Sequence, residues 1–184
     1  MKLVVLDRDG VINVDSRDYV KSEQEWKALP GSLDAIGRLY RSGYRIVVVT
    51  NQAGIARGKL NAEILAAIHQ KMLAHLSQYG GVIEAIFFCP HAPEDNCNCR
   101  KPKPGLLKEL SRRLREKLHG VPCIGDKLSD IEAARAAGAS PILVRTGHGQ
   151  AIVDAGEVPQ GVPVYADLRA AVDAILSRGT AAPH

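Results

Sequence analysis

The chain has 184 residues, of which 46% are hydrophobic and 24% charged, with a formal net charge of +4. This length and composition fit one globular domain with a sizeable core. The net positive charge is modest, and the sequence has no dense stretch of Lys and Arg with interleaved aromatic residues, which is what single-stranded nucleic acids bind. We therefore expect no nucleic-acid partner. No apolar stretch is long enough for a signal-peptide core or a membrane span, so we expect a cytoplasmic protein without membrane contact.

Apolar, β-branched runs typical of buried strands alternate with amphipathic stretches typical of helices. In chain order we expect strand Leu3–Leu6, helix 32–43, strand Ile46–Val49, helix 61–79, strand Val82–Phe88, helix 105–119, strand Val121–Ile124, helix 129–138, strand Ile142–Val144 and helix Leu168–Leu176. Ser129 and Glu132 form the capping-box pattern at the start of one helix. The segment 148–166 shows no regular pattern.

This alternation predicts an α/β fold with a doubly wound parallel sheet and right-handed crossovers. We expect a single domain over residues 1–178 and a frayed tail over residues 179–184. The connections are short and leave no room for an inserted cap domain.

The first strand ends in two carboxylates. Because side chains alternate along a strand, Asp7 and Asp9 project to the same side, just past its carboxyl end. In open parallel sheets ligands bind at that edge. Two neighbouring carboxylates repel each other, so the pair indicates a metal, a shared proton or both. The alternative is a polar strand end that caps the following segment.

Two further strand ends carry polar residues, Thr50-Asn51 and Asp126-Lys127. Carboxylates at Asp7 and Asp126 suit a hard, oxygen-preferring ion such as Mg²⁺. The Thr50 hydroxyl suits phosphate oxygens, and Lys101 and Lys127 offer positive charge to a phosphoryl group. Each residue alone has an ordinary structural explanation, but together they predict phosphoryl-transfer chemistry.

Four short motifs carry a family resemblance in order across nearly the whole chain. They are Asp7-x-Asp9-Gly10-Val11, Thr50-Asn51, Lys101 before Pro-x-Pro-Gly, and Gly125-Asp126-Lys127-x-x-Asp130. The set resembles the haloacid-dehalogenase (HAD) phosphohydrolase superfamily. The longer runs Asp7–Asn13, Val49–Gly58 and Cys99–Pro102 resemble the heptose-bisphosphate phosphatase family in its histidinol-phosphatase-like branch. Members of that branch have a Rossmann-like core without a cap.

The resemblance implies a phosphatase mechanism. Asp7 would attack phosphorus and form an aspartyl-phosphate. Mg²⁺ would be held by Asp7, Asp126 and the backbone carbonyl of Asp9. The Asp9 side chain would protonate the leaving alkoxide and then activate water. Thr50 and Lys101 would bind the transferring group.

The resemblance also implies a small phosphorylated sugar as substrate. Substrate contacts are expected from Asp15, Tyr19, Asn51, Gln52, Arg57, Arg100 and Lys127. The reaction it implies is removal of the C7 phosphate of heptose 1,7-bisphosphate, in the supply of ADP-heptose for lipopolysaccharide cores. Histidinol phosphate is the alternative substrate, because neither composition nor spacing separates the two.

A second cluster predicts a zinc site. Cys89-x-His91 and Cys97-x-Cys99 supply three thiols and one imidazole, the closed tetrahedral set of structural Zn²⁺ sites. A chance grouping of loop cysteines is the alternative. The loop leads directly into Arg100 and Lys101, so a metal there would fix both cations over the crevice. The fourth cysteine, Cys123, fits a buried strand.

A non-enzymatic alternative is a receiver-type phosphoacceptor domain, which also combines an Asp, a Thr and a Lys on an α/β sheet. In such domains the phosphorylated Asp follows the third strand, whereas here that strand leads into Cys89. His69, His75 and His119 lie in helical stretches and are interpreted as ordinary surface or half-buried residues. We assign no role to His148, and we expect a monomer.

Overall fold

The computed structural model describes residues 2–180 and contains one six-stranded parallel sheet, in the order β3-β2-β1-β4-β5-β6. The strands are β1 (Lys2–Leu6), β2 (Tyr44–Asn51), β3 (Ala85–Cys89), β4 (Pro122–Gly125), β5 (Ser140–Val144) and β6 (Val164–Tyr165). The helices are α1 (Ser32–Arg41), α2 (Ala62–Ser77), α3 (Gly105–Leu114), α4 (Leu128–Ala136), α5 (Gly149–Asp154) and α6 (Leu168–Thr180), with a 3₁₀ turn η1 (Pro93–Asp95). The predicted doubly wound α/β fold is therefore confirmed.

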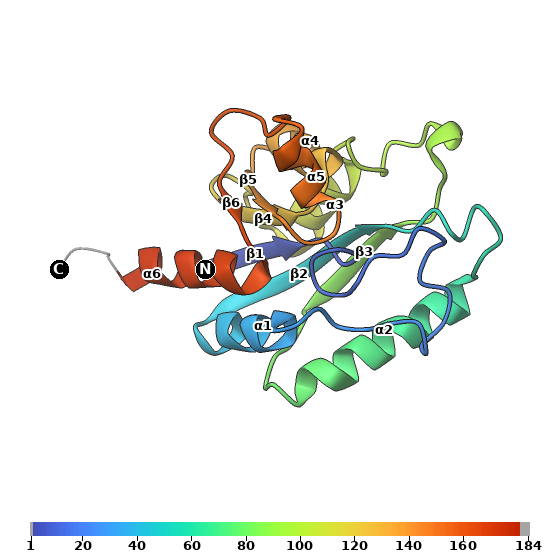
Figure 1. Ribbon diagram of the computed structural model, residues 1–184, viewed down its shortest axis with the longest axis horizontal. Coiled ribbons are helices and arrows are strands. Elements are labelled where there is room, and N and C mark those ends of the chain that lie inside the picture. Colours follow the sequence, from blue (N-terminus) through green and yellow to red (C-terminus); the bar gives the residue numbers. More distant parts are fainter. Residues whose placement is uncertain (1, 181–184) are drawn as a thin grey trace.

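The sheet is covered on both faces, which explains the uninterrupted apolar runs. Along β1, Val4 and Leu6 pack into one core with helices α1, α2 and α6, while Leu3 and Val5 pack into a second core with α3 and α4. Figure 1 shows α1 and α2 on one side of the sheet and α3, α4 and α5 on the other. The direction of strand order reverses between β1 and β4, and this reversal is where doubly wound sheets bind ligands.

Several predicted element boundaries were wrong. Helix α3 ends at Leu114, short of His119, because Arg115 adopts a left-handed conformation with φ 55°. Helix α4 begins at Leu128, so Ser129 lies inside its first turn; the Asp130 carboxylate accepts from the backbone N–H of Lys127 at 3.0 Å and takes over the capping role.

The patternless segment 148–166 contains the short helix α5 and the two-residue strand β6, which the sequence did not indicate. Helix α6 continues to Thr180, and residues 181–184 of the predicted frayed tail lie outside the described residues. The domain boundaries and the absence of a cap stay predictions. Among the described residues, no helix is long and apolar enough to cross a membrane.

Candidate active site

A cavity of about 620 Å³ opens at the carboxyl ends of β1 and β2. Most residues predicted to act on substrate line it. They are Asp7, Asp9, Asp15, Tyr19, Thr50, Asn51, Gln52, Arg100, Lys101 and Lys127. Strand ends far apart in sequence meet here because parallel strands present their carboxyl ends at one edge.

Lys101 is buried between two carboxylates. Its Nζ lies 3.0 Å from Asp7 Oδ1 and 2.6 Å from Asp130 Oδ1, and it donates to the Val49 carbonyl at 2.8 Å. Burial alone would lower the pKa of Lys101, but the two carboxylates raise it above its ordinary value, so the ammonium stays charged. Burial raises the pKa of Asp7 from 3.8 to about 6 despite this lysine. Asp130 is the last residue of the fourth motif, to which the sequence assigned no role. In the structure it lines the cavity and pairs with Lys101.

Asp126 is a buried carboxylate with one oxygen free of partners. Its Oδ2 accepts from the His148 backbone N–H at 2.9 Å, whereas Oδ1 has no hydrogen-bond partner among the described residues. Gly10 and Gly147 flank it so closely that a Cβ on either would overlap Oδ2. Burial and the neighbouring Asp7 raise the pKa of Asp126 from 3.8 to about 8.

Three carboxylates can therefore offer oxygens to one cation. One oxygen each from Asp7, Asp126 and Asp130 lies within 4.8 Å of the others. Burial is the main cause of the raised pKa values of Asp7 and Asp126, and repulsion from neighbouring carboxylates adds to it. A divalent cation would relieve that repulsion. Oxygen ligands in this number suit Mg²⁺.

The Asp9 carboxylate accepts hydrogen bonds from three side chains. Arg8 donates to Oδ1 from Nη2 at 2.8 Å and from Nε at 3.1 Å. Asn13 donates to the same oxygen at 2.9 Å, and Gln52 donates to Oδ2 at 2.9 Å. Burial would raise the pKa of Asp9, but the Arg8 charge and these hydrogen bonds hold it below 3.8.

Two residues predicted to bind substrate also hold other site residues. Asn51 makes two hydrogen bonds to the backbone of Lys101, donating to its carbonyl at 3.0 Å and accepting from its N–H at 3.1 Å. Gln52 donates both to Asp9 and to Thr50 Oγ1, the latter at 3.0 Å. Both side chains thereby position Lys101 and Asp9 while lining the cavity.

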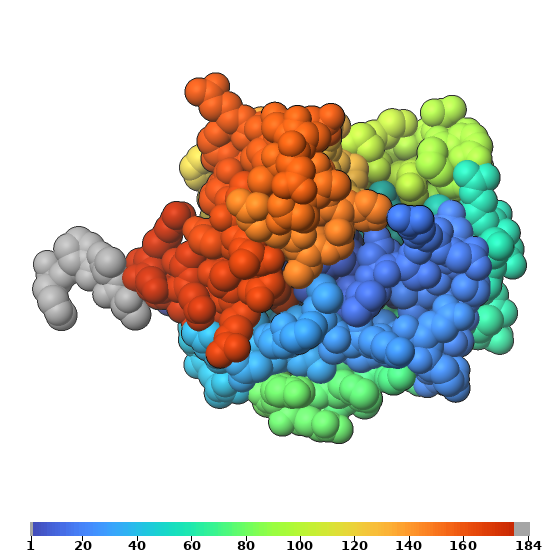
Figure 2. All heavy atoms as spheres, in the orientation of Figure 1, coloured from blue at the N-terminus to red at the C-terminus, as the bar shows by residue number. Residues whose placement is uncertain are grey.

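Asp15 joins three segments at the cavity rim. It accepts from Lys127 Nζ at 3.0 Å and lies 3.0 Å from His148 Nε2. Figure 2 shows the corresponding blue N-terminal and orange C-terminal segments meeting on one face of the molecule. His148, to which the sequence assigned no role, thus belongs to the rim through both its side chain and its backbone.

Arg57 does not line this cavity. Its guanidinium pairs with Glu94 of η1 at 2.5 Å, which links the loop after β2 to the cysteine-bearing loop. Arg100 does line the cavity and donates to the His91 carbonyl at 3.2 Å.

The predicted zinc ligands form a compact cluster. Cys89, His91, Cys97 and Cys99 each direct one ligand atom into it. The three sulfur atoms lie 3.2, 3.5 and 3.6 Å apart, and His91 Nδ1 lies 3.3 Å from Cys99 Sγ. A tetrahedron with Zn–S bonds of about 2.3 Å has edges of about 3.8 Å, close to these separations. All four cysteines of the chain are free thiols.

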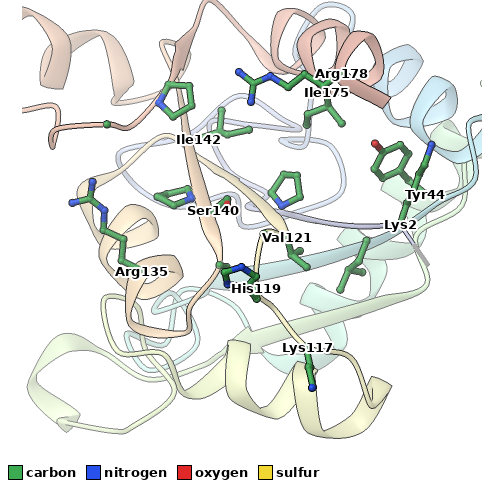
Figure 3. A pocket seen from close by; sticks show the side chains of 17 residues that line it. Lys2, Tyr44, Lys117, His119, Val121, Arg135, Ser140, Ile142, Ile175 and Arg178 are labelled. Atoms are coloured by element: carbon green, nitrogen blue, oxygen red, sulfur yellow. The ribbon is translucent and has the colours of Figure 1, made fainter. Parts of the chain in front are cut away.

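A second cavity, of about 810 Å³, lies at the amino ends of β1, β2, β4 and β5; Figure 3 shows the side chains that line it. Its charged lining residues are Lys2, Lys117, Arg135 and Arg178, and the described residues that line it include no Asp or Glu. It has no carboxylates with which to hold a divalent cation, so the chemistry belongs to the cavity at the carboxyl ends of the strands.

Comparison with known proteins gives consistent matches. The model of the polynucleotide kinase 3 phosphatase family matches residues 2–128, and that of the HAD-hydrolase-like family matches residues 98–171. The D-glycero-beta-D-manno-heptose-1,7-bisphosphate 7-phosphatase of Bordetella bronchiseptica is 51% identical over 96% of this chain and 98% of its own. The enzyme of the same name from Pseudomonas putida is 46% identical over 92% and 97%.

A solved structure of the D,D-heptose 1,7-bisphosphate phosphatase from B. bronchiseptica, complexed with magnesium and phosphate, has a TM-score of 0.94 at 50% identity and covers 97% of this chain and 99% of its own. The corresponding enzyme from Burkholderia thailandensis has a TM-score of 0.77 at 44% identity, covering 96% and 99%. These identities extend over nearly the full length of both chains. The chain therefore belongs to the D-glycero-β-D-manno-heptose-1,7-bisphosphate 7-phosphatase family of the HAD superfamily of phosphoric monoester hydrolases.

Proposed function

We propose that this protein removes the C7 phosphate of D-glycero-β-D-manno-heptose 1,7-bisphosphate. The observation that carries the proposal is the convergence of three groups: Asp7 and Lys101 pair in the lining of one cavity, and Asp126, with its partner-free oxygen, offers a ligand atom within 4.8 Å of Asp7. The substrate follows from the names of relatives up to 51% identical to the chain. Those names leave the histidinol phosphate alternative without support, and family membership likewise excludes the receiver-type alternative.

The acidic cluster supports a bound Mg²⁺. The donor set is made of hard oxygens, and the partner-free Oδ1 of Asp126 supplies an oxygen that nothing else in the described chain uses. We propose Asp7, Asp126 and the Asp9 carbonyl as ligands. Magnesium held there supplies positive charge that offsets the repulsion between the Asp7 carboxylate and a phosphate dianion. The Bordetella relative was crystallised in complex with magnesium and phosphate, which supports Mg²⁺ as the cation.

In the first step Asp7 attacks phosphorus. A bond forms between a carboxylate oxygen and phosphorus, and the bond from phosphorus to the sugar oxygen breaks. Lys101 fixes Asp7 Oδ1 and faces the transferring group with a permanent charge. Thr50 offers its hydroxyl from the end of β2. The leaving alkoxide takes its proton from the Asp9 carboxyl.

In the second step Asp9 acts as a base. Its carboxylate accepts a proton from water, and the resulting hydroxide attacks the aspartyl-phosphate and releases inorganic phosphate. The Arg8 charge and the hydrogen bonds to Asp9 stabilise the charged carboxylate that this step needs. A phosphate dianion entering beside Asp9 raises its pKa, and this favours the protonated form that the first step needs.

We propose Zn²⁺ for the Cys/His cluster. Three thiolates and one imidazole leave no open position for substrate, so the role is structural. The cluster fixes the loop that carries Arg100 and Lys101, and the Arg57–Glu94 pair ties this loop to the segment after β2.

The test is phosphate release with Mg²⁺ from both anomers of heptose 1,7-bisphosphate and from histidinol phosphate, with phosphorus NMR to identify the phosphate that leaves. We expect loss of the C7 phosphate and a preference for the β anomer. Faster turnover of histidinol phosphate, or loss of the C1 phosphate, would overturn the proposal. Asp7→Asn should abolish turnover, and appreciable residual activity in that variant would exclude the aspartyl-phosphate.

A further inference from the structure

Arg8 is a fully buried arginine in the first loop of the site. It is 0% exposed, and its guanidinium donates in several directions. Nε and Nη2 donate to Asp9, and Nη2 also approaches Gln52 Oε1 at 3.3 Å. Nη1 points the other way, to His69 Nε2 on α2, at 3.1 Å. His69 is 61 residues away in the sequence, which is why no spacing pattern pairs the two.

The His69 ring is neutral and accepts a hydrogen bond from Arg8. Its side chain is 9% exposed, and its ring packs edge-on against Phe88 of β3 with 6.5 Å between ring centroids. Burial, together with the Arg8 charge, lowers the pKa of His69 from 6.5 to about 4. Because Nη1 of Arg8 can only donate, Nε2 of His69 accepts, and the ring proton lies on Nδ1.

We infer that His69 is a positioning residue for the reaction and acts on Asp9 through Arg8. A buried guanidinium that loses an acceptor must find another or move, because an unsatisfied buried donor is costly. Movement of Arg8 changes the orientation of the Asp9 carboxylate, since Arg8 provides two of the hydrogen bonds to Oδ1. Helix α2 thereby supports the acid/base group from outside the cavity.

This inference rests on the proposed function, in which Asp9 protonates the leaving alkoxide. A positioned general acid contributes typically about 10²–10⁴-fold to a rate. A leaving group that departs without a proton gains little from it. The second step, in which Asp9 is the base, is common to all substrates, whereas kcat/KM reports only the first step. A fault in Asp9 orientation therefore lowers kcat/KM much more for a sugar phosphate than for an ester of a nitrophenol, whereas a general loss of folded protein lowers both alike.

The experiment compares His69→Leu with His69→Gln. Leucine fills the space without an acceptor, whereas the Oε1 of glutamine reaches the position of Nε2. We expect His69→Leu to lower kcat/KM for heptose 1,7-bisphosphate by about 10–100-fold, and kcat/KM for p-nitrophenyl phosphate by less than about 3-fold. KM should change little, because His69 does not line the cavity. His69→Gln should restore kcat/KM for the sugar phosphate.

Met72→Ala is the matched control. Met72 lies three residues further along α2 and is fully buried in the core, so its truncation destabilises the same helix while keeping both partners of the Arg8–His69 hydrogen bond. It should lower the melting temperature without a leaving-group effect. If His69→Leu does not fold, His69→Asn replaces it, because its oxygen ends one bond short of Nε2.

Equal losses on both substrates, or no rescue by glutamine, would overturn the inference while leaving the phosphatase function standing. If the unsubstituted protein released no phosphate from heptose 1,7-bisphosphate, both would fall.

Discussion

The stability of the protein without magnesium should fall as pH rises through about 8. Asp126 has a folded-state pKa raised from 3.8 to about 8. A carboxyl whose pKa is raised on folding stabilises the folded state at low pH, and that stabilisation is lost as pH rises through the folded-state pKa. Between about pH 7 and about pH 9 the folded state releases this proton, while the unfolded state has already released it. The free energy of unfolding then falls by about 1.4 kcal/mol.

This pH window separates Asp126 from its neighbours. The pKa of Asp7, about 6, places most of its effect below the window. His69 has a pKa lowered to about 4, so its contribution to stability is lost only as pH falls below 6.5. All other titrating groups also contribute to the pH dependence of stability, and an Asp126→Asn variant retains them. Because its amide is neutral at all these pH values, the difference between the two proteins reports Asp126.

The assay is urea unfolding in magnesium-free buffer, without chelator so that the Zn²⁺ proposed for the Cys/His cluster is not removed. The pH-dependent loss of stability should be larger in the unsubstituted protein than in Asp126→Asn by about 1.4 kcal/mol. Added Mg²⁺ should remove the excess, because a bound cation keeps the carboxylate charged, and should raise the stability by mass action. Equal slopes in the two proteins without Mg²⁺, or an excess that persists after Mg²⁺ is added, would refute the reasoning.

Three further changes test how the site is held. Asn51→Ala removes both hydrogen bonds to the Lys101 backbone, so unfolding should become easier by about 2 kcal/mol and kcat should fall, by denaturation and steady-state kinetics; unchanged kcat would show that Lys101 needs no such support. Gly147→Ala should weaken Mg²⁺ activation by crowding Asp126 at a backbone φ of 59°, whereas Gly43→Ala, at φ 80° in open space, should cost only stability, about 1 kcal/mol. Removal of the metal from the Cys/His cluster, with Mg²⁺ resupplied, should lower turnover, and unaltered rates would contradict its structural role.

The fold and the chemical groups were predictable because they follow from local rules. Asp7, Thr50 and Asp126 each follow a buried apolar run, and parallel strands bring such ends together. The thiols and the imidazole were recognisable from composition and spacing alone. None of these conclusions needs a side-chain orientation or a contact between distant segments.

The supporting residues were not predictable, because their partners are distant in sequence. Arg8 stands in the sequence between Asp7 and Asp9, for which we propose catalytic roles, yet its contact with His69 depends on where α2 packs. Asn51 lines the cavity, and its use as a substrate ligand stays a prediction, but its two hydrogen bonds to the Lys101 backbone could not be foreseen. Helix α5 and strand β6 were missed because they are too short to establish a period.

The charges of the site explain why so much of the structure serves as support. Asp9 is balanced by Arg8, and Asp15 by Lys127. Asp7 and Asp130 pair with Lys101, and Asp126 offers an oxygen within 4.8 Å of theirs, so the three carboxylates in their charged forms leave an excess of two negative charges over Lys101. That excess matches one divalent cation. Without the cation the charged forms oppose folding, because burial and mutual repulsion both raise the pKa values of Asp7 and Asp126. Hydrogen bonds from Asn51 and from the His148 backbone therefore hold these residues in an arrangement that electrostatics alone would disperse.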